Sequence, residues 1–133
     1  MGVLRRFGPT WYTTRMLINA FKLVVLERYA QFEGRAGRAE YWWFFLANLL
    51  ISVGFSVLGR AAGFILFIGW LVSLALLIPS LAVAIRRLHD TSRSGWWLLI
   101  ALIPFVGWII LIVFLASEGT PGSNEYGVTA AGP

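Results

Sequence analysis

The chain has 133 residues, of which 59% are hydrophobic and only 13% are charged, and its formal net charge is +5. Soluble domains carry roughly a quarter charged residues because water must wet their surface, so this composition indicates a protein embedded in lipid. The sequence has no cysteine, one histidine and one aspartate, which excludes disulfides and argues against a metal site with several side-chain ligands. We therefore expect no metal and no cofactor.

The N-terminal part of the chain predicts an amphipathic helix over about residues 11–32. Arg15, Asn19 and Lys22 recur at helical spacing on one face, and apolar side chains fill the remaining arc. Charges in this segment would be costly at the bilayer centre, so we expect the helix to lie in the headgroup plane. A transmembrane helix over residues 11–30 is the alternative.

Three long runs without any charged side chain follow, and they predict three transmembrane helices at about residues 41–58, 61–85 and 96–116. Even the shortest run extends about 27 Å as a helix, close to the roughly 30 Å of hydrocarbon that it must cross. Backbone in lipid must satisfy its own hydrogen bonds, so these runs should be helical. The expected fold is an all-α membrane protein with three transmembrane helices preceded by an interfacial amphipathic helix.

Two prolines fall inside these runs and predict kinks in the second and third helices. Pro79 cannot donate to the carbonyl of Ala75, and Ser80 is the neighbouring side chain that we expect to serve it. Pro104 stands in "LIPFVGW", in the middle of the third run. We expect a single crossing there because lipid-exposed breaks are disfavoured. A re-entrant hairpin, which would return the tail to the side it came from, is the alternative.

The basic residues set the expected orientation. Ten of the eleven lysine and arginine residues precede the first run or lie between the second and third, whereas only Arg60 lies between the first and second. Cytoplasmic segments carry such an excess, so residues 1–40 are expected in the cytoplasm. With residues 41–117 as the three-helix domain, the Arg60 turn and the tail, residues 118–133, would face the other side. The tail is rich in glycine and proline and should form turns.

The stretches "GRAGRAEYWW" and "TSRSGWW" share a plan in which small and basic residues precede a tandem tryptophan. Indole rings prefer the membrane interface and arginine pairs with phosphate, so both stretches are expected to contact anionic lipid or a partner protein. These lipid- or partner-binding candidates are Arg35, Arg38, Trp42, Trp43, Arg86, Arg87, Arg93, Trp96 and Trp97.

Glu40, His89 and Asp90 lie among these basic residues, and we expect them to form a structural ion-pair network. In a helix that continues from the second run, Asp90 follows Arg86 by four positions and Arg87 by three, so it can pair with either.

The same segment admits a catalytic interpretation, in which Asp90 orients His89 and Ser92 or Ser94 is the nucleophile. Adjacent side chains on a helix diverge by about 100°, so this His–Asp pair makes a poor dyad, and no glycine-rich oxyanion turn accompanies it. We therefore predict no catalytic residue and a protein that is not an enzyme. DNA binding is also not expected, because the basic residues adjoin the membrane runs and no recognition helix is evident.

Four motifs in order, "FEGRAGRAEYWWFF", "LLIPSLAVAIRRLHDTSRSGWW", "LIPFVGWIILIVF" and "EGTPGSNEYG", resemble the DUF805 family over roughly residues 20–127. The resemblance implies a multi-pass protein of the bacterial inner membrane, with the RRLHD segment and the GTPGxN tail as hallmarks. It implies no reaction, because the family has no established activity. The chain departs from the family at Ser92, where glycine is frequent. Combined with the charge bias, the N-terminus would be cytoplasmic and the C-terminus periplasmic.

Three helices alone bury little surface, so we expect the chain to form a homo-oligomer or to be an accessory subunit of a larger membrane complex. Its role would be structural, with its arginine and tryptophan residues against the anionic head groups of membrane lipids or against a partner. The alternative is a small oligomeric transporter or channel whose path is lined where Pro79 and Pro104 bend the helices.

Overall fold

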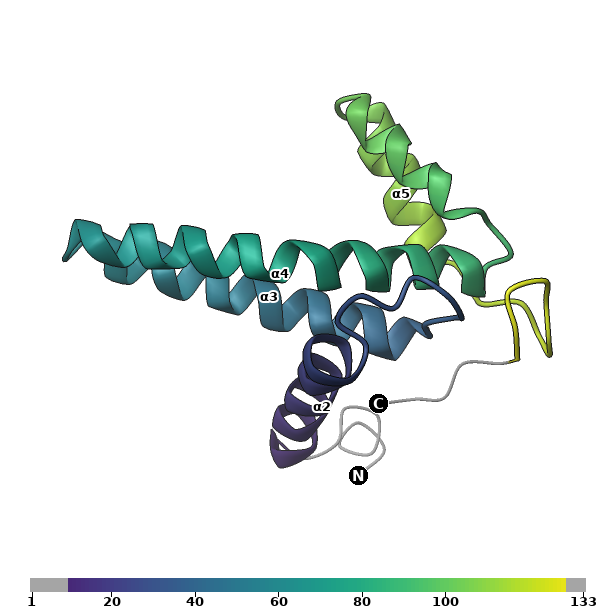
Figure 1. Ribbon diagram of the computed structural model, residues 1–133, viewed down its shortest axis with the longest axis horizontal. Coiled ribbons are helices and arrows are strands. Elements are labelled where there is room, and N and C mark those ends of the chain that lie inside the picture. Colours follow the sequence, from purple (N-terminus) through teal and green to yellow (C-terminus); the bar gives the residue numbers. More distant parts are fainter. Residues whose placement is uncertain (1–9, 129–133) are drawn as a thin grey trace.

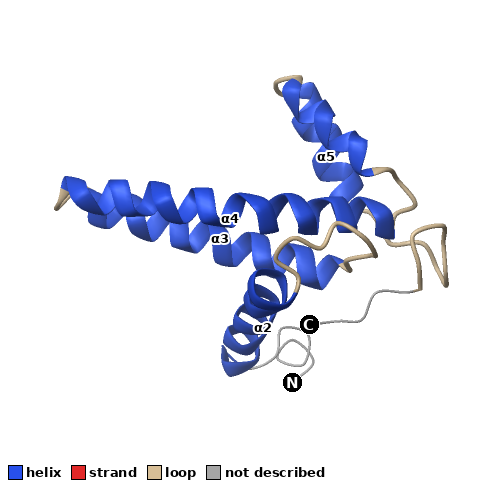
Figure 2. Ribbon diagram, viewed as in Figure 1, coloured by secondary structure: helices blue, strands red, loops and turns tan. Residues whose placement is uncertain are grey.

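The computed structural model of the protein describes residues 10–128, and all regular elements of this part are helices (Figures 1 and 2). The all-α prediction is confirmed for these residues. In chain order the elements are α2 (Thr10–Lys22), the π-helical turn η1 (Leu23–Glu27), α3 (Arg38–Gly59), α4 (Gly63–Asp90), the 3₁₀ helix η2 (Gly95–Leu102) and α5 (Val106–Ala116).

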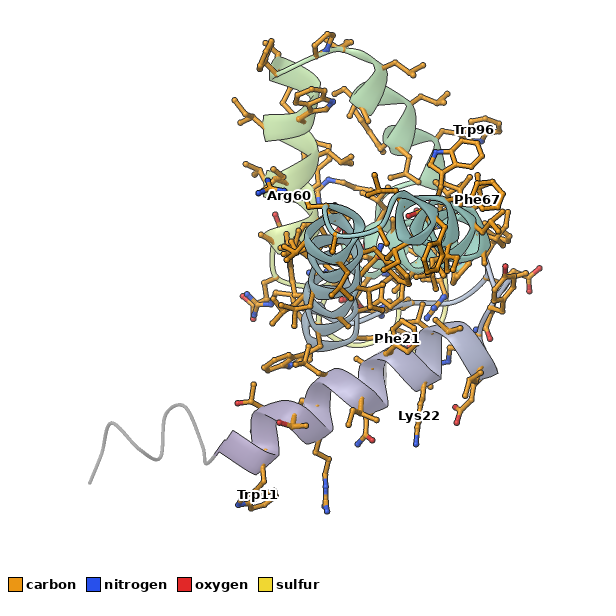
Figure 3. All side chains as sticks on the ribbon, turned by 90° about the vertical axis from the view of Figure 1, so that its left-hand side faces the viewer. Trp11, Phe21, Lys22, Arg60, Phe67 and Trp96 are labelled. Carbon is orange, nitrogen blue, oxygen red and sulfur yellow. The ribbon has the colours of Figure 1, made fainter. Side chains whose placement is uncertain are left out.

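The two long helices, α3 and α4, form an antiparallel hairpin and lie side by side along their length (Figures 1 and 3). Their 22 and 28 residues extend about 33 and 42 Å, enough to cross the roughly 30 Å of hydrocarbon. Within the described chain they are the two helices that are long and apolar enough to span a membrane. Many of their large apolar side chains face outward, as expected where lipid surrounds the helices.

α4 continues through Pro79, and the carbonyl that this proline leaves without a donor is satisfied by another segment. The hydroxyl of Tyr29 donates to the Ala75 carbonyl oxygen at 2.6 Å. Ser80, which we expected to serve Ala75, instead donates to the Leu76 carbonyl at 2.6 Å. Pro79 thus provides a docking point for the segment that follows η1.

α2 runs across the α3–α4 hairpin rather than along it (Figure 3). Its 13 residues extend about 20 Å, too short to cross the bilayer. The Phe21 and Phe44 rings stack with centroids 6.0 Å apart, and Val24 of η1 is buried with Phe44 and Val83 in a small core. The predicted N-terminal helix is therefore present, although it ends with η1. Its place in the headgroup plane stays a prediction.

The prediction of one helix over residues 96–116 is wrong. This segment forms two short helices, η2 and α5, which fold back on each other as a hairpin (Figure 1). Pro104 lies in the turn between them, not inside a helix. Across the hairpin, the indole Nε1 of Trp108 donates to the Ala101 carbonyl oxygen at 2.9 Å.

The residues around Pro104 explain this turn. Proline removes a backbone donor, and Phe105 adopts a left-handed φ of 63°, so a continuous helix is interrupted at both positions. Gly107 lets the two halves approach closely, because a Cβ there would collide with the carbonyl oxygen of Ile100.

The hairpin returns the chain to the end of α3 and α4 from which it left. The described part of the tail lies beside the last turn of α4, where the Thr120 amide donates to the Asp90 carbonyl oxygen at 2.7 Å. The expectation that the tail lies opposite the N-terminal segment therefore fails together with the single crossing. Which of the two ends faces the cytoplasm stays a prediction.

Site-directed labelling tests this arrangement, and the cysteine-free sequence makes the experiment straightforward. We expect Glu33→Cys, before α3, and Ser123→Cys, in the tail, to react with a membrane-impermeant maleimide from the same side of the membrane. Ala61→Cys, in the turn between α3 and α4, should react only from the other side. All three residues are exposed, so their labelling reports sidedness rather than burial. Labelling of Glu33→Cys and Ser123→Cys from opposite sides would restore the single crossing.

Candidate functional site

Six charged side chains meet where α3 begins and α4 ends, and they form the most buried polar cluster of the described chain. Two further parts of the chain cover the last turns of α4. They are the segment between η1 and α3, and the tail. The six residues, hereafter the arginine network, are Arg28, Arg35, Glu40, Arg86, Arg87 and Asp90.

Glu40 holds the first half of the network. Its side chain is completely buried, and its Oε1 accepts from Arg86 Nη1 at 2.6 Å and from Arg28 Nη1 at 3.2 Å. Glu40 lies in the first turn of α3, where the positive end of the helix dipole also favours a carboxylate. Arg86 is equally buried, and its Nη2 has no hydrogen-bond partner among the described residues.

Asp90 holds the second half in the same manner. Its Oδ2 accepts from Arg87 Nη1 at 2.6 Å, and its Oδ1 accepts from Arg35 Nε at 2.9 Å. Each carboxylate is therefore shared by two arginines, one from α4 and one from the segment that precedes α3. The four guanidinium groups exceed the two carboxylates by two positive charges.

Backbone carbonyls at helix ends compensate for this excess. Arg87 Nε donates to the Leu115 carbonyl at 2.8 Å, and its Nη2 donates to the Ser117 carbonyl, both at the end of α5. Arg35 Nη2 donates to the Asp90 carbonyl at 3.4 Å, at the end of α4. The C-terminal ends of helices carry partial negative charge, so these arginines occupy the positions that helix dipoles favour for cations.

The tail is bound to this network by hydrogen bonds and a ring contact. Arg35 donates from Nη1 to the Gly122 carbonyl at 2.6 Å and from Nη2 to the Thr120 carbonyl at 2.7 Å. Asn124 Nδ2 donates to the His89 carbonyl at 2.9 Å, and the His89 ring stacks on Tyr126 with centroids 4.0 Å apart. The tail does form turns, as predicted, but sequence reasoning missed their attachment to the helix ends. The GTPGxN motif was the available signal.

Ser92 occupies a backbone position that favours glycine. It adopts a left-handed φ of 60° directly after α4. The amides of Ser92 and Arg93 donate to the carbonyls of His89 and Leu88 at 3.0 and 2.9 Å, the pattern that ends many helices with glycine. The Ser92 hydroxyl contacts that of Thr120, so the tail gains a contact that glycine would not supply.

The other predicted binding residues lie outside the network. Arg38 is exposed in the first turn of α3, and the Arg93 guanidinium lies 4.0 Å from the centroid of the Phe114 ring. Trp42 Nε1 donates to the Leu115 carbonyl at 3.3 Å, whereas Trp96 is 78% exposed and points outward (Figure 3). The structure therefore divides the predicted residues into a buried set and an exposed set. The exposed or half-buried set is Arg38, Trp42, Trp43, Arg93, Trp96 and Trp97.

The geometry around His89 does not form a catalytic dyad. Both carboxylate oxygens of Asp90 accept from arginines, and His89 Nδ1 lies 3.0 Å from the Gly34 carbonyl oxygen. No ion pair of His89 is present in the described part of the chain. Residues 10–128 also contain no group of three or more side chains arranged to hold a metal ion.

Comparisons with known proteins agree on a membrane family. A family model described as "Protein of unknown function (DUF805)" matches residues 29–128, which include five of the six network residues. The chain is 49% identical over 106 residues to inner membrane protein YhaI of Escherichia coli (strain K12), covering 79% of this chain and 90% of YhaI. It is 44% identical over 116 residues to inner membrane protein YhaH of the same organism, covering 79% of this chain and 91% of YhaH. No solved structure matches.

The Glu40→Gln variant tests whether the network supports the fold. We expect a loss of about 3–5 kcal/mol of stability, because the buried guanidinium group of Arg86 and the half-buried one of Arg28 would lose their shared counter-charge. Thermal unfolding of the detergent-solubilised protein, followed by tryptophan fluorescence, measures the effect. Glu33→Gln is the matched control, since Glu33 is exposed and has no ion pair among the described residues. Equal melting temperatures for the two variants would show that Glu40 is not an anchor.

A second prediction concerns the docked tail. In Gly119→Ala, the new Cβ would collide with the Asp90 carboxylate, so the tail should detach while α3 and α4 stay paired. Hydrogen exchange at the Thr120 and Asn124 amides should then be at least about tenfold faster. Ser123→Ala, an exposed substitution in the same tail, should leave the exchange unchanged. Unaltered protection in Gly119→Ala would mean that the tail is not held at Asp90.

Proposed function

Since the chain belongs to the DUF805 family of membrane proteins, whose function is unknown, we propose for it a non-enzymatic, structural role in the inner membrane. In this proposal the arginine network builds a rigid cap on the cytoplasmic ends of α3 and α4. The cap presents an exposed arginine and interfacial tryptophans to anionic lipid. The chain works as an oligomer or as an accessory subunit beside other membrane proteins.

One observation carries this proposal: the network uses its arginines internally. Arg86 and Arg87 are fully buried, Arg35 is 5% exposed, and each donates to a carboxylate and to at least one backbone carbonyl. Charged groups are buried at such cost only when they are paired, and removing a partner is strongly destabilising. Their part is therefore to hold the cap together, and contact with lipid falls to the exposed residues.

Arg38 is the best placed of these exposed residues. It lines a groove of about 380 Å³ on α3 together with Ala39, Trp42, Trp43 and Leu46. Arginine binds phosphate through two parallel N–H groups, and indole rings favour the level of the head groups. Arg38 also begins α3, so the positive end of the helix dipole adds to the attraction for an anion.

The cytoplasmic placement of the cap rests on the charge count. Arg28, Arg35, Arg38, Arg86, Arg87 and Arg93 lie where α3 begins and α4 ends, whereas Arg60 follows the other end of α3. The return of the tail leaves this count unchanged, because residues 117–133 contain no lysine or arginine. The positive-inside bias therefore favours the cap in the cytoplasm.

The lipid contact is tested with Arg38→Gln. We expect the purified variant to retain about fivefold less phosphatidylglycerol relative to phosphatidylethanolamine, since one basic residue near an anionic surface is worth about 1 kcal/mol. Native mass spectrometry in mild detergent measures the bound lipid.

Arg60→Gln is the matched control, because it removes the same charge from an exposed position at the other end of α3. It should leave lipid retention unchanged. If Arg38→Gln retains phosphatidylglycerol as the wild-type chain does, the proposed contact is refuted.

A further inference from the structure

The η2–α5 hairpin is too short to cross a membrane. The 8 residues of η2 extend about 16 Å at the 3₁₀ rise, and the 11 residues of α5 extend about 16 Å at the α-helical rise. Each arm therefore reaches about half of the roughly 30 Å hydrocarbon core. A hairpin of this length can enter one leaflet but not the other.

Both ends of the hairpin are fixed at the cap. On the entering side, Gly95 lies against the side chain of Ile85, where a Cβ would approach Ile85 Cγ2 to 2.8 Å. On the returning side, the Leu115 carbonyl accepts from Arg87 and from Trp42. The hairpin therefore leaves and rejoins the α3–α4 pair near the same end.

The surface of the hairpin is apolar and uncovered. Its turn exposes 81% of Leu102 and 72% of Phe105, and no charged residue occurs between Arg93 and Glu118. An apolar surface of this kind on a chain with two membrane spans is covered by the hydrocarbon of the adjacent leaflet.

α2 adds material between the middle of the α3–α4 pair and the cap. It packs on Phe44 of α3 and borders a groove with Ala47 and Leu50. α2 and the η2–α5 hairpin lie on opposite sides of the α3–α4 pair (Figures 1 and 3). Around the far turn, Gly59 to Gly63, the described chain contributes only α3 and α4 (Figure 1). One half of the protein is therefore much broader than the other.

We infer that the protein is a leaflet wedge: it displaces more lipid from the leaflet on the cap side than from the opposite leaflet. An inclusion of this shape is accommodated best where the broader side lies in an expanded, convex leaflet. The partner that the wedge recognises is a lipid surface of this curvature. The inference depends neither on the lipid contact of Arg38 nor on which side is the cytoplasm.

Orientation in vesicles of different size tests the wedge. The full chain carrying Ser123→Cys is reconstituted into small sonicated and large extruded vesicles of uncharged phosphatidylcholine, and the introduced thiol is labelled from outside before and after permeabilisation. The outer leaflet of the small vesicles is strongly convex. We expect the ratio of cap-outward to cap-inward molecules to be at least about twofold higher in small vesicles. A ratio independent of vesicle size overturns the inference.

A matched pair of variants separates the hairpin from the bulk of the cap. Leu102→Asn with Phe105→Asn makes the hairpin turn polar and should abolish the size dependence. Leu58→Asn with Phe64→Asn makes the same change at exposed positions near the far turn and should preserve it. If the first pair keeps the full size dependence, the hairpin is not the wedge and the inference fails.

A spin label on Leu102→Cys identifies what covers the turn. Lipid cover predicts strong relaxation by oxygen, weak relaxation by a polar nickel complex, and no spin–spin broadening. Broadening between labels would mean that a second copy covers the hairpin, which would overturn the wedge.

Discussion

A guanidinium group taken out of water needs a carboxylate or a set of carbonyl oxygens, and this requirement organises the cap end of the protein. Arg86 and Arg87 are consecutive on α4, and each pairs with a different acid. Arg86 reaches Glu40 at the start of α3, and Arg87 reaches Asp90 on its own helix. Because two carboxylates serve four arginines, the further acceptors are backbone carbonyls at helix ends, in the segment before α3 and in the tail.

The need for backbone acceptors links the network to the path of the chain. The carbonyls of Leu115 and Ser117 serve Arg87, and they reach it only because η2 and α5 turn back toward the cap. A single crossing over residues 96–116 would carry both carbonyls to the far side of the membrane and leave Arg87 with only Asp90 and the Ala36 carbonyl. The hairpin and the network therefore depend on each other. The tail then continues past Arg35, which donates to three more carbonyls, those of Thr120, Gly122 and Gly127.

The sequence predicted the helical class and the two long spans because charge-free runs of that length have one stable form in lipid. It also placed Asp90 within reach of Arg87. It did not predict that the third apolar run forms a hairpin, since such a run has the same composition whether it crosses the membrane or turns back. Only Pro104 and Gly107 indicate the turn. Nor did it predict that the arginines are buried, because hydropathy and spacing treat arginine as a surface residue. Pairing with Glu40 spans 46 positions of the chain, and no local pattern reports a contact of that kind.

The division of the arginines changes how their substitution must be interpreted. Neutralising Arg35, Arg86 or Arg87 removes a buried charge and leaves its carboxylate and carbonyl acceptors without a donor, so such a variant disturbs the cap and does not report on lipid contact alone. Arg38 and Arg60 are both exposed, and they lie at opposite ends of α3. A difference in lipid retention between the Arg38→Gln and Arg60→Gln variants therefore reports the location of the charge and not a folding defect. The proposed lipid contact can therefore be tested separately from stability by comparing these two exposed positions. The similar patterns of "GRAGRAEYWW" and "SRSGWW" do not reveal this division. In the first stretch, Arg35 is buried in the network, whereas Arg38 is exposed.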